Sequence, residues 1–187
     1  MNRYFLFYKP YAVLTQFSPE NNKQTLGNFL SLPRSVYPVG RLDYDSEGLL
    51  LLTDDNETKH ALTDPAHRIP KTYLVQVERI PSDESLQSLR TGVVVEKKMT
   101  KPAEVHLLDN EPMLPPRPVP IRHRKTVPTV WLEITIHEGR NRQVRKMTAA
   151  VGHPTLRLVR TKIGNLSIGS MLPGECKEIT KMDIFSF

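Results

Sequence analysis

The chain of 187 residues lacks the features that mark several large classes of protein. Cys176 is its only cysteine, which excludes an internal disulfide and a multi-cysteine zinc site. No stretch approaches the run of about 18 apolar residues that a membrane-spanning helix needs. Glycine-rich phosphate loops of the G-x-x-x-x-G-K-[ST] and G-x-G-x-x-G types and the G-x-S-x-G nucleophile motif are missing. These absences favour a reducing, cytoplasmic setting with no membrane contact, and argue against common nucleotide-binding and serine-hydrolase sites.

Acidic residues are absent from residues 139–174, although the formal net charge of the whole chain is only +6. That segment contains seven basic residues: Arg140, Arg142, Arg145, Lys146, Arg157, Arg160 and Lys162. Positive charge concentrated in this way predicts a polyanionic partner. The alternative is a solvated face that only aids solubility.

The periodicity of apolar residues predicts an α+β fold with a largely antiparallel, mixed sheet flanked by helices. Four consecutive leucines within residues 49–53 indicate a strand buried on both faces, and residues 130–136 alternate as a strand with one buried face does. Other strands are expected at residues 4–8, 36–39, 72–77, 93–95, 103–108, 156–161 and 176–179. Helices are expected at residues 25–30, 56–63, 82–91 and 141–151, the last two capped by Ser82 and Asn141.

Residues 109–128 contain six prolines and several basic residues. Proline has no backbone N–H to donate, so the segment is expected to be an extended loop. A loop of this length within a compact domain is usually functional.

Asp43 is the strongest candidate for a reactive side chain. It lies in the polar run at residues 40–48, just before the buried leucine strand and two residues after Arg41. A loop at the rim of a rigid scaffold is a common place for function, and a neighbouring arginine favours the ionised carboxylate that nucleophilic attack requires. Judged by position alone, Asp43 is more typical of a turn-forming residue that caps backbone amides.

Four ordered motifs resemble those of RNA pseudouridine synthases, and most closely the branch that modifies single uridines in ribosomal RNA. Gly40-Arg41-Leu42-Asp43 with the following Ser-Glu-Gly-Leu-Leu resembles the catalytic loop, and Phe7-Tyr8-Lys9-Pro10 is similar to the opening motif. Lys71-Thr72-Tyr73 resembles the second motif. Residues 138–147 and 156–164 look like the last two, and together these motifs extend over nearly the whole chain.

The resemblance implies a role for each matching residue. Asp43 would be the nucleophile, attacking either the base or the ribose C1′, and Arg41 would help to hold the flipped nucleotide. Tyr73 would stack on the uracil and Leu158 would pack on the other side of the pocket. Arg145 would pair with the catalytic carboxylate, with the neighbouring Arg142 as the alternative. Without the resemblance, Tyr73 and Leu158 are typical of core residues.

The implied function is the isomerisation of one uridine of large-subunit (23S) ribosomal RNA to pseudouridine, without a cofactor or a metal. The expected partner is this RNA, free or in an assembly particle, and the protein is expected to act as a monomer. The resemblance also implies a single catalytic domain over residues 1–187, with lobes of approximately 1–66 and 67–187 around a central cleft, and no separate N-terminal RNA-binding domain. RNA contacts are then expected from eight basic residues: Arg122, Arg124, Lys125, Arg140, Arg142, Lys146, Arg160 and Lys162.

Two other functions compete with this interpretation. A non-catalytic RNA-binding or ribosome-assembly factor would keep its function when Asp43 is replaced by asparagine. A nucleoside hydrolase that uses a carboxylate would release free uracil, which a synthase would not.

The proline-rich loop yields the first testable prediction. Replacing Arg122, Arg124 and Lys125 with alanine should weaken RNA binding and flatten its salt dependence, because each phosphate contact releases counterions. If the protein neutralises about five phosphates of single-stranded RNA, log K against log salt should have a slope of about −3.5, and the triple variant a shallower one. Unchanged affinity at every salt concentration would contradict the role of this loop.

Overall fold

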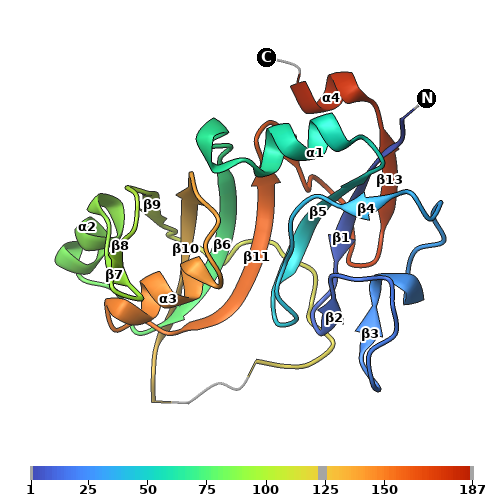
Figure 1. Cartoon of the computed structure of the whole chain (residues 1–187). Coiled ribbons are helices and arrows are strands. Elements are labelled where there is room, and N and C mark those ends of the chain that lie inside the picture. The colour runs from blue at the N-terminus through green and yellow to red at the C-terminus, as the bar shows by residue number, and fades with distance from the viewer. Residues whose placement is uncertain (1, 122–125, 186–187) are drawn as a thin grey trace. The chain divides into compact units, whose positions relative to one another are not determined.

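The computed structural model describes residues 2–121 and 126–185, and in this part of the chain the polypeptide forms two compact units (Figure 1). The first unit comprises Met1–Ile69 and Arg160–Phe187, and the second comprises Pro70–Val159. The first change of unit lies close to the expected lobe boundary, whereas the return of the chain to the first unit at Arg160 had no counterpart in the sequence pattern.

The first unit contains short and long strands with two helices. Its elements are β1 (Tyr4–Lys9), β2 (Val13–Leu14), β3 (Gln24–Thr25), β4 (Tyr37–Pro38), β5 (Glu47–Thr53), β12 (Leu166–Ser167), β13 (Cys176–Ile179), α1 (Asn56–Thr63) and α4 (Lys181–Phe185), with 3-10 turns at Leu26–Asn28 and Pro65–His67. Strand β1 pairs antiparallel with both β5 and β13. The short strands β2 and β3 pair in parallel, so the pairing is mixed but largely antiparallel.

All seven residues of β5 are buried, which confirms the prediction of a strand covered on both faces. Leu49 and Leu51 belong to one hydrophobic cluster together with Leu6 of β1. Leu50 and Leu52 belong to a second cluster on the opposite face. Burial of four leucine side chains contributes roughly 1.5–3 kcal/mol each, so β5 is the central element of this unit.

Asp55 ties the end of β5 to both helices of the unit. Its buried carboxylate accepts hydrogen bonds from the Tyr4 hydroxyl (2.6 Å) and from the backbone amides of Glu57 (3.0 Å) and Thr58 (3.2 Å), which caps α1. Lys181 of α4 forms an ion pair with it at 3.0 Å. The Tyr4 hydroxyl, followed by Lys181 and Thr58, holds the pKa of Asp55 well below its usual range although burial opposes this.

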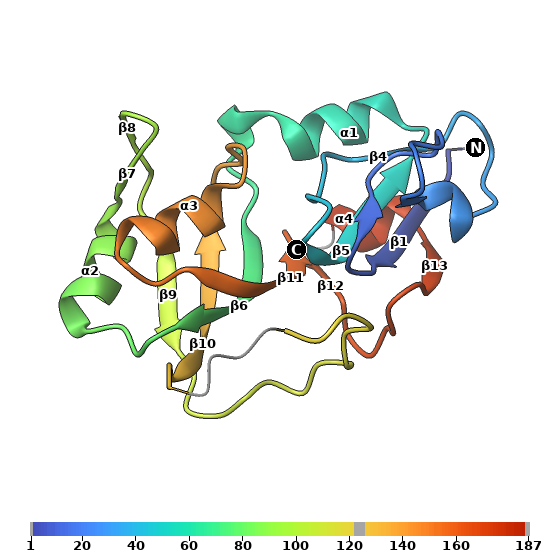
Figure 2. The same ribbon diagram turned by 90° about the horizontal axis from the view of Figure 1, so that it is seen from below.

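The second unit contains antiparallel strands and two helices (Figure 2). Its elements are β6 (Lys71–Glu78), α2 (Asp83–Thr91), β7 (Val94–Val95), β8 (Lys98–Met99), β9 (Glu104–Leu107), β10 (Thr129–Ile136) and α3 (Gln143–Ala150). Strand β10 pairs with β6 on one side and β9 on the other. Strand β11 (Thr155–Ile163) begins in this unit and ends in the first.

These elements confirm the α+β class and most of the expected helices and strands, with local corrections. Helix α3 is capped by Arg142 in the left-handed conformation rather than by Asn141. The helix expected at residues 25–30 is only the 3-10 turn at Leu26–Asn28, with Thr25 at its N-cap position. Of the strand expected at residues 36–39, only Tyr37–Pro38 pairs. The described residues of the proline-rich loop contain no helix or strand, as expected.

The longest helix in the described part of the chain, α2, has nine residues. No described helix is long and apolar enough to cross a lipid bilayer.

Gly48 should be the least replaceable glycine of the first unit. Its φ is +107°, and an added Cβ would lie 2.2 Å from the carbonyl oxygen of Arg160. Because both the backbone conformation and the contact oppose a side chain, Gly48→Ala should lower the free energy of unfolding by at least about 3 kcal/mol.

Gly40 provides the matched control for this change. Its φ is +72°, but an added Cβ would meet nothing within 4 Å. Gly40→Ala should therefore cost only the strain of a left-handed residue, about 1–2 kcal/mol. Equal losses for the two variants in urea denaturation would contradict the importance of the Gly48–Arg160 contact.

Candidate active site

The loop that carries Asp43 is held mainly through its backbone. The amide of Ser46 donates to the carbonyl of Asp43 (3.1 Å), which closes a turn, and the amide of Ala12 donates to the carbonyl of Tyr44 (2.9 Å). Gly40 begins the loop in the left-handed conformation and Gly48 ends it within β5. The carboxylate of Asp43 is thus attached to a backbone that is fixed at both ends, while the side chain itself remains partly exposed.

Thr15 fixes the residue that precedes Asp43. Its buried hydroxyl donates to the carbonyl of Leu42 (2.6 Å) and accepts from the amide of Leu42 (3.3 Å). The side chain of Leu42 is buried as well. A single hydroxyl therefore satisfies both backbone groups of Leu42, which restrains the direction of the neighbouring Asp43. The sequence motifs contain no signal for this contact, since the two residues are 27 positions apart.

A buried cation lies beneath the loop. Lys9, the last residue of β1, is opposite Gly48 in the register and is fully buried. Its ammonium group donates to the carbonyls of Pro10 (2.9 Å) and Val13 (2.7 Å). Burial lowers the pKa of Lys9 to about 7, partly offset by the carboxylates of Glu47, Asp45 and Asp43.

Arg160 adds a second buried basic group behind the same loop. It is 4% exposed, and its Nε donates to the carbonyl of Leu49 (2.8 Å). Its Nη2 has no hydrogen-bond partner among the described residues, and neither does the buried hydroxyl of Ser46. A buried polar atom without a partner costs about 1–3 kcal/mol. The loop of Asp43 is therefore backed by charged and polar groups, including Glu47, rather than by an apolar wall.

The predicted site residues divide between the two units. Asp43 and the exposed Arg41 belong to the first unit. Tyr73 on β6 and Leu158 on β11 belong to the second and are buried. Arg145 on α3 belongs to the second unit too, and its Nη1 donates to the carbonyl of Thr155, the first residue of β11 (3.4 Å). A shared pocket for these residues and Asp43 remains a prediction.

The basic residues expected to contact RNA have different surroundings. Lys162 and Arg142 are exposed, whereas Arg160 is buried and would have to be uncovered before it could touch a phosphate. Arg140 and Lys146 are engaged within the second unit by hydrogen bonds to the β7–β8 hairpin. Arg122, Arg124 and Lys125 lie outside the described residues. Among the described residues, no group of three His, Cys, Asp or Glu is placed to hold a metal ion.

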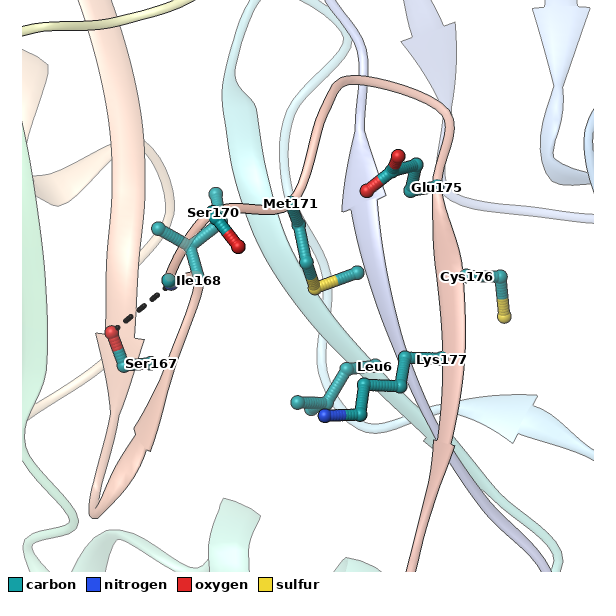
Figure 3. Close-up of a pocket in the computed structure, with 9 residues that line it drawn as sticks. Leu6, Ser167, Ile168, Ser170, Met171, Glu175, Cys176 and Lys177 are labelled. Atoms are coloured by element: carbon teal, nitrogen blue, oxygen red, sulfur yellow. Dashed lines mark hydrogen bonds between the residues drawn. The ribbon is translucent and has the colours of Figure 1, made fainter.

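A cavity of about 510 Å³ in the first unit contains none of the predicted site residues (Figure 3). It lies between Leu6 of β1 and the segment that leads from β12 to β13. Its polar groups hold that segment together: the amide of Gly169 donates to the Ser167 hydroxyl (3.3 Å), and the amide of Leu172 donates to the carboxylate of Glu175 (2.9 Å). The cavity is therefore explained by loop packing.

Comparisons with known proteins agree with the motifs. The model of the RNA pseudouridylate synthase family matches residues 3–150. Ribosomal large subunit pseudouridine synthase E of Xanthomonas axonopodis pv. citri is 58% identical over 170 residues, which are 90% of this chain and 89% of that protein. The protein of the same name from Vibrio parahaemolyticus is 48% identical and covers 93% of this chain and 72% of its own length.

A solved structure extends the likeness to the fold. The crystal structure of a pseudouridylate synthase superposes with a TM-score of 0.81 at 31% sequence identity, over 98% of this chain and 73% of that one. The match therefore includes both units and every motif that the sequence analysis singled out.

Lys9 generates a prediction about pH. The unfolded lysine has a pKa of 10.5 and the folded one about 7, so between these values the unfolded state binds more protons. The contribution of this group to the free energy of unfolding should then increase with pH over that window, by about 1.4 kcal/mol per pH unit at most. Lys9→Met removes the titration, so the free energy of unfolding of wild type minus that of the variant should become more positive from pH 7 to pH 9.

Urea denaturation at several pH values measures this difference. Lys162→Met, a replacement of an exposed lysine, controls for the loss of one positive charge. Parallel stability profiles for wild type and Lys9→Met would show that Lys9 does not titrate as its burial requires.

Proposed function

Because this chain belongs to the RNA pseudouridylate synthase family, we propose that it isomerises one uridine of large-subunit ribosomal RNA, with Asp43 as the nucleophile. Its activity is that of an RNA pseudouridine synthase, an isomerase. The substrate class is supported by the names of its relatives, ribosomal large subunit pseudouridine synthases E that are up to 58% identical over most of both chains.

The reaction breaks the C1′–N1 glycosidic bond, turns the uracil and joins its C5 to C1′. No group is gained or lost and no electron is transferred, so the protein's own side chains are sufficient for the proposed chemistry. The carboxylate of Asp43 attacks the nucleotide and holds one fragment while the base turns, and its bond to that fragment breaks again to release the carboxylate. C5 loses its proton and N1 takes one up, so the product has the same composition as the substrate. The attacked atom is either C1′ of the ribose or a carbon of the base.

The other predicted residues serve to hold the nucleotide. Tyr73 stacks on the uracil and Leu158 packs against its other side, while Arg145 pairs with the carboxylate of Asp43. Arg41 contacts the RNA backbone. Removing a uridine from its stack costs a few kcal/mol, and less in a loop or an irregular helix, so an unpaired uridine is the expected target.

The anchored loop is the observation that carries this proposal. Asp43 remains partly exposed, whereas Leu42 before it and Ser46 after it are buried and hydrogen-bonded through the backbone. A reactive carboxylate must keep one orientation without losing access to its substrate, and this arrangement provides both. A non-catalytic assembly factor has no need of a carboxylate held in this way.

Asp43→Asn should abolish isomerisation while RNA binding survives. The amide keeps the shape of the side chain but cannot act as the nucleophile, so the single-turnover rate on large-subunit ribosomal RNA should fall by at least about 10³-fold. Pseudouridine is detected by carbodiimide modification followed by primer extension, and free uracil is assayed in the same reactions.

Asp45→Asn is the matched control, since it removes a carboxylate from the same loop. This variant should keep at least about one tenth of the wild-type rate, because the carboxylate of Asp45 is not the proposed nucleophile. Wild-type activity in Asp43→Asn would refute the proposed nucleophile. Free uracil in place of pseudouridine would identify a hydrolase instead.

A further inference from the structure

The β7–β8 hairpin of the second unit is a short, exposed ribbon with an unusual turn. Val94 pairs with Met99 and Val95 with Lys98, which leaves Glu96 and Lys97 as the two turn residues. Both have positive φ values, 51° and 63°. Two-residue turns of this kind usually contain asparagine, aspartate or glycine, since other residues lose about 1–2 kcal/mol each in the left-handed conformation. The turn therefore needs support from the rest of the unit.

Two basic residues supply that support. The guanidinium group of Arg140 donates to the carbonyls of Val95, Lys98 (3.3 Å) and Met99 (3.4 Å). Lys146 of α3 forms an ion pair with Glu96 at 2.6 Å, and its hydrogen bond is the main reason why the pKa of Glu96 lies below its usual value. The hairpin is thereby fixed against α3, the helix that also carries Arg145 (Figure 2).

The fixed hairpin presents an exposed apolar pair on one face, with exposed lysines at its turn, on its other face and after its second strand. Val94 and Met99 are 59% and 64% exposed, and as directly opposite residues they lie on the same face of the ribbon. Lys97, Lys98 and the nearby Lys101 are exposed as well. The one acidic residue of the turn, Glu96, is already paired with Lys146.

This combination fits RNA better than a protein partner. Two apolar side chains cover far less area than the roughly 800 Å² per partner of a stable protein interface. Apolar side chains do pack against the faces of unstacked bases, and lysines placed beside them neutralise phosphates. A rigid hairpin also binds with a smaller loss of conformational entropy than a mobile loop.

We propose that the β7–β8 hairpin is a second RNA-binding surface, on which Val94 and Met99 contact an unstacked base while Lys97, Lys98 and Lys101 contact phosphates of the same RNA. This inference rests on the proposed function, because it takes the RNA substrate of the enzyme as the ligand. It assigns to Arg140 and Lys146 the task of holding the hairpin, in place of direct contact with phosphates.

Two double variants separate the apolar and the charged parts. Val94→Thr with Met99→Thr removes the apolar pair but keeps residues that favour strands. Lys97→Asn with Lys98→Thr removes two charges, and asparagine tolerates the left-handed turn position. Lys177→Thr with Met182→Gln, on β13 and α4, is the matched control because both residues are exposed and lie in the other unit.

The measurements are the affinity for a large-subunit ribosomal RNA fragment at several salt concentrations and the single-turnover rate at saturating protein. Both hairpin variants should bind the RNA about tenfold more weakly, which is a loss of about 1.4 kcal/mol of binding free energy. The rate at saturating protein should stay within about twofold of the wild-type rate. The charge variant should lose about 1.4 units of the slope of log K against log salt, as expected for two phosphates of single-stranded RNA, and the apolar variant should keep the slope. Thermal denaturation of each variant checks that the fold is intact.

Unchanged affinity in both folded variants, or an unchanged slope in the charge variant, would overturn the inference. Binding to anionic phospholipid vesicles that the hairpin variants lose, with RNA affinity unchanged, would overturn it in favour of a membrane surface. Failure of the proposed function is recognised separately, because wild-type protein would then bind the RNA without forming pseudouridine.

Discussion

The close contact between Gly48 and the backbone of Arg160 is the constraint on which the candidate active site depends. A Cβ at Gly48 would lie 2.2 Å from the carbonyl of Arg160, so only glycine allows the start of β5 to lie so near to β11. The same approach brings the Arg160 side chain to the carbonyl of Leu49 and buries Lys9 opposite Gly48. The loop of Asp43 therefore ends on a strand that cannot shift without disturbing two buried basic side chains.

Burial of the Lys9 ammonium group behind the loop costs hydration free energy, and its position beside three carboxylates gives a physical reason for that cost. Lys9 loses enough hydration for its pKa to fall to about 7, although the carboxylates of Glu47, Asp45 and Asp43 partly offset the loss. An apolar residue of similar size would avoid this cost. A positive group beneath a loop of carboxylates instead favours one arrangement of that loop, in which the backbone around Asp43 is already set before the substrate arrives. Preorganisation of this kind is how a carboxylate on a loop can be as well placed as one on a helix or strand.

Several parts of the fold were predictable because they depend on local patterns. Four consecutive leucines predicted the buried β5, and Ser82 predicted the start of α2, whose N-cap it is. The start of α3 was misplaced because Arg142 caps it in a left-handed conformation that a sequence read residue by residue does not reveal. The return of the chain to the first unit at Arg160 was missed for a similar reason. Strand β11 is continuous, and the pattern of apolar residues along it does not show where it passes from the second unit to the first.

The candidate site was predictable only through its motifs. Asp43, Tyr73, Arg145 and Leu158 were chosen by resemblance, and their joint role stays a prediction. The contacts of Thr15 with Leu42, and of Lys9 with Pro10 and Val13, depend on how the chain folds back on itself. Arg160 and Arg140 were expected to contact RNA because they belong to the basic segment without acidic residues. One is buried and the other holds a hairpin, which only the three-dimensional arrangement could reveal.

The most direct test of the central claim is a map of pseudouridines in ribosomal RNA from cells that lack this protein. Deletion of its gene should remove pseudouridine from one position of the large-subunit RNA and leave the small-subunit RNA unchanged. The wild-type gene should restore that position, and a gene that encodes asparagine in place of Asp43 should not. Persistence of every pseudouridine in the deletion strain would contradict the account.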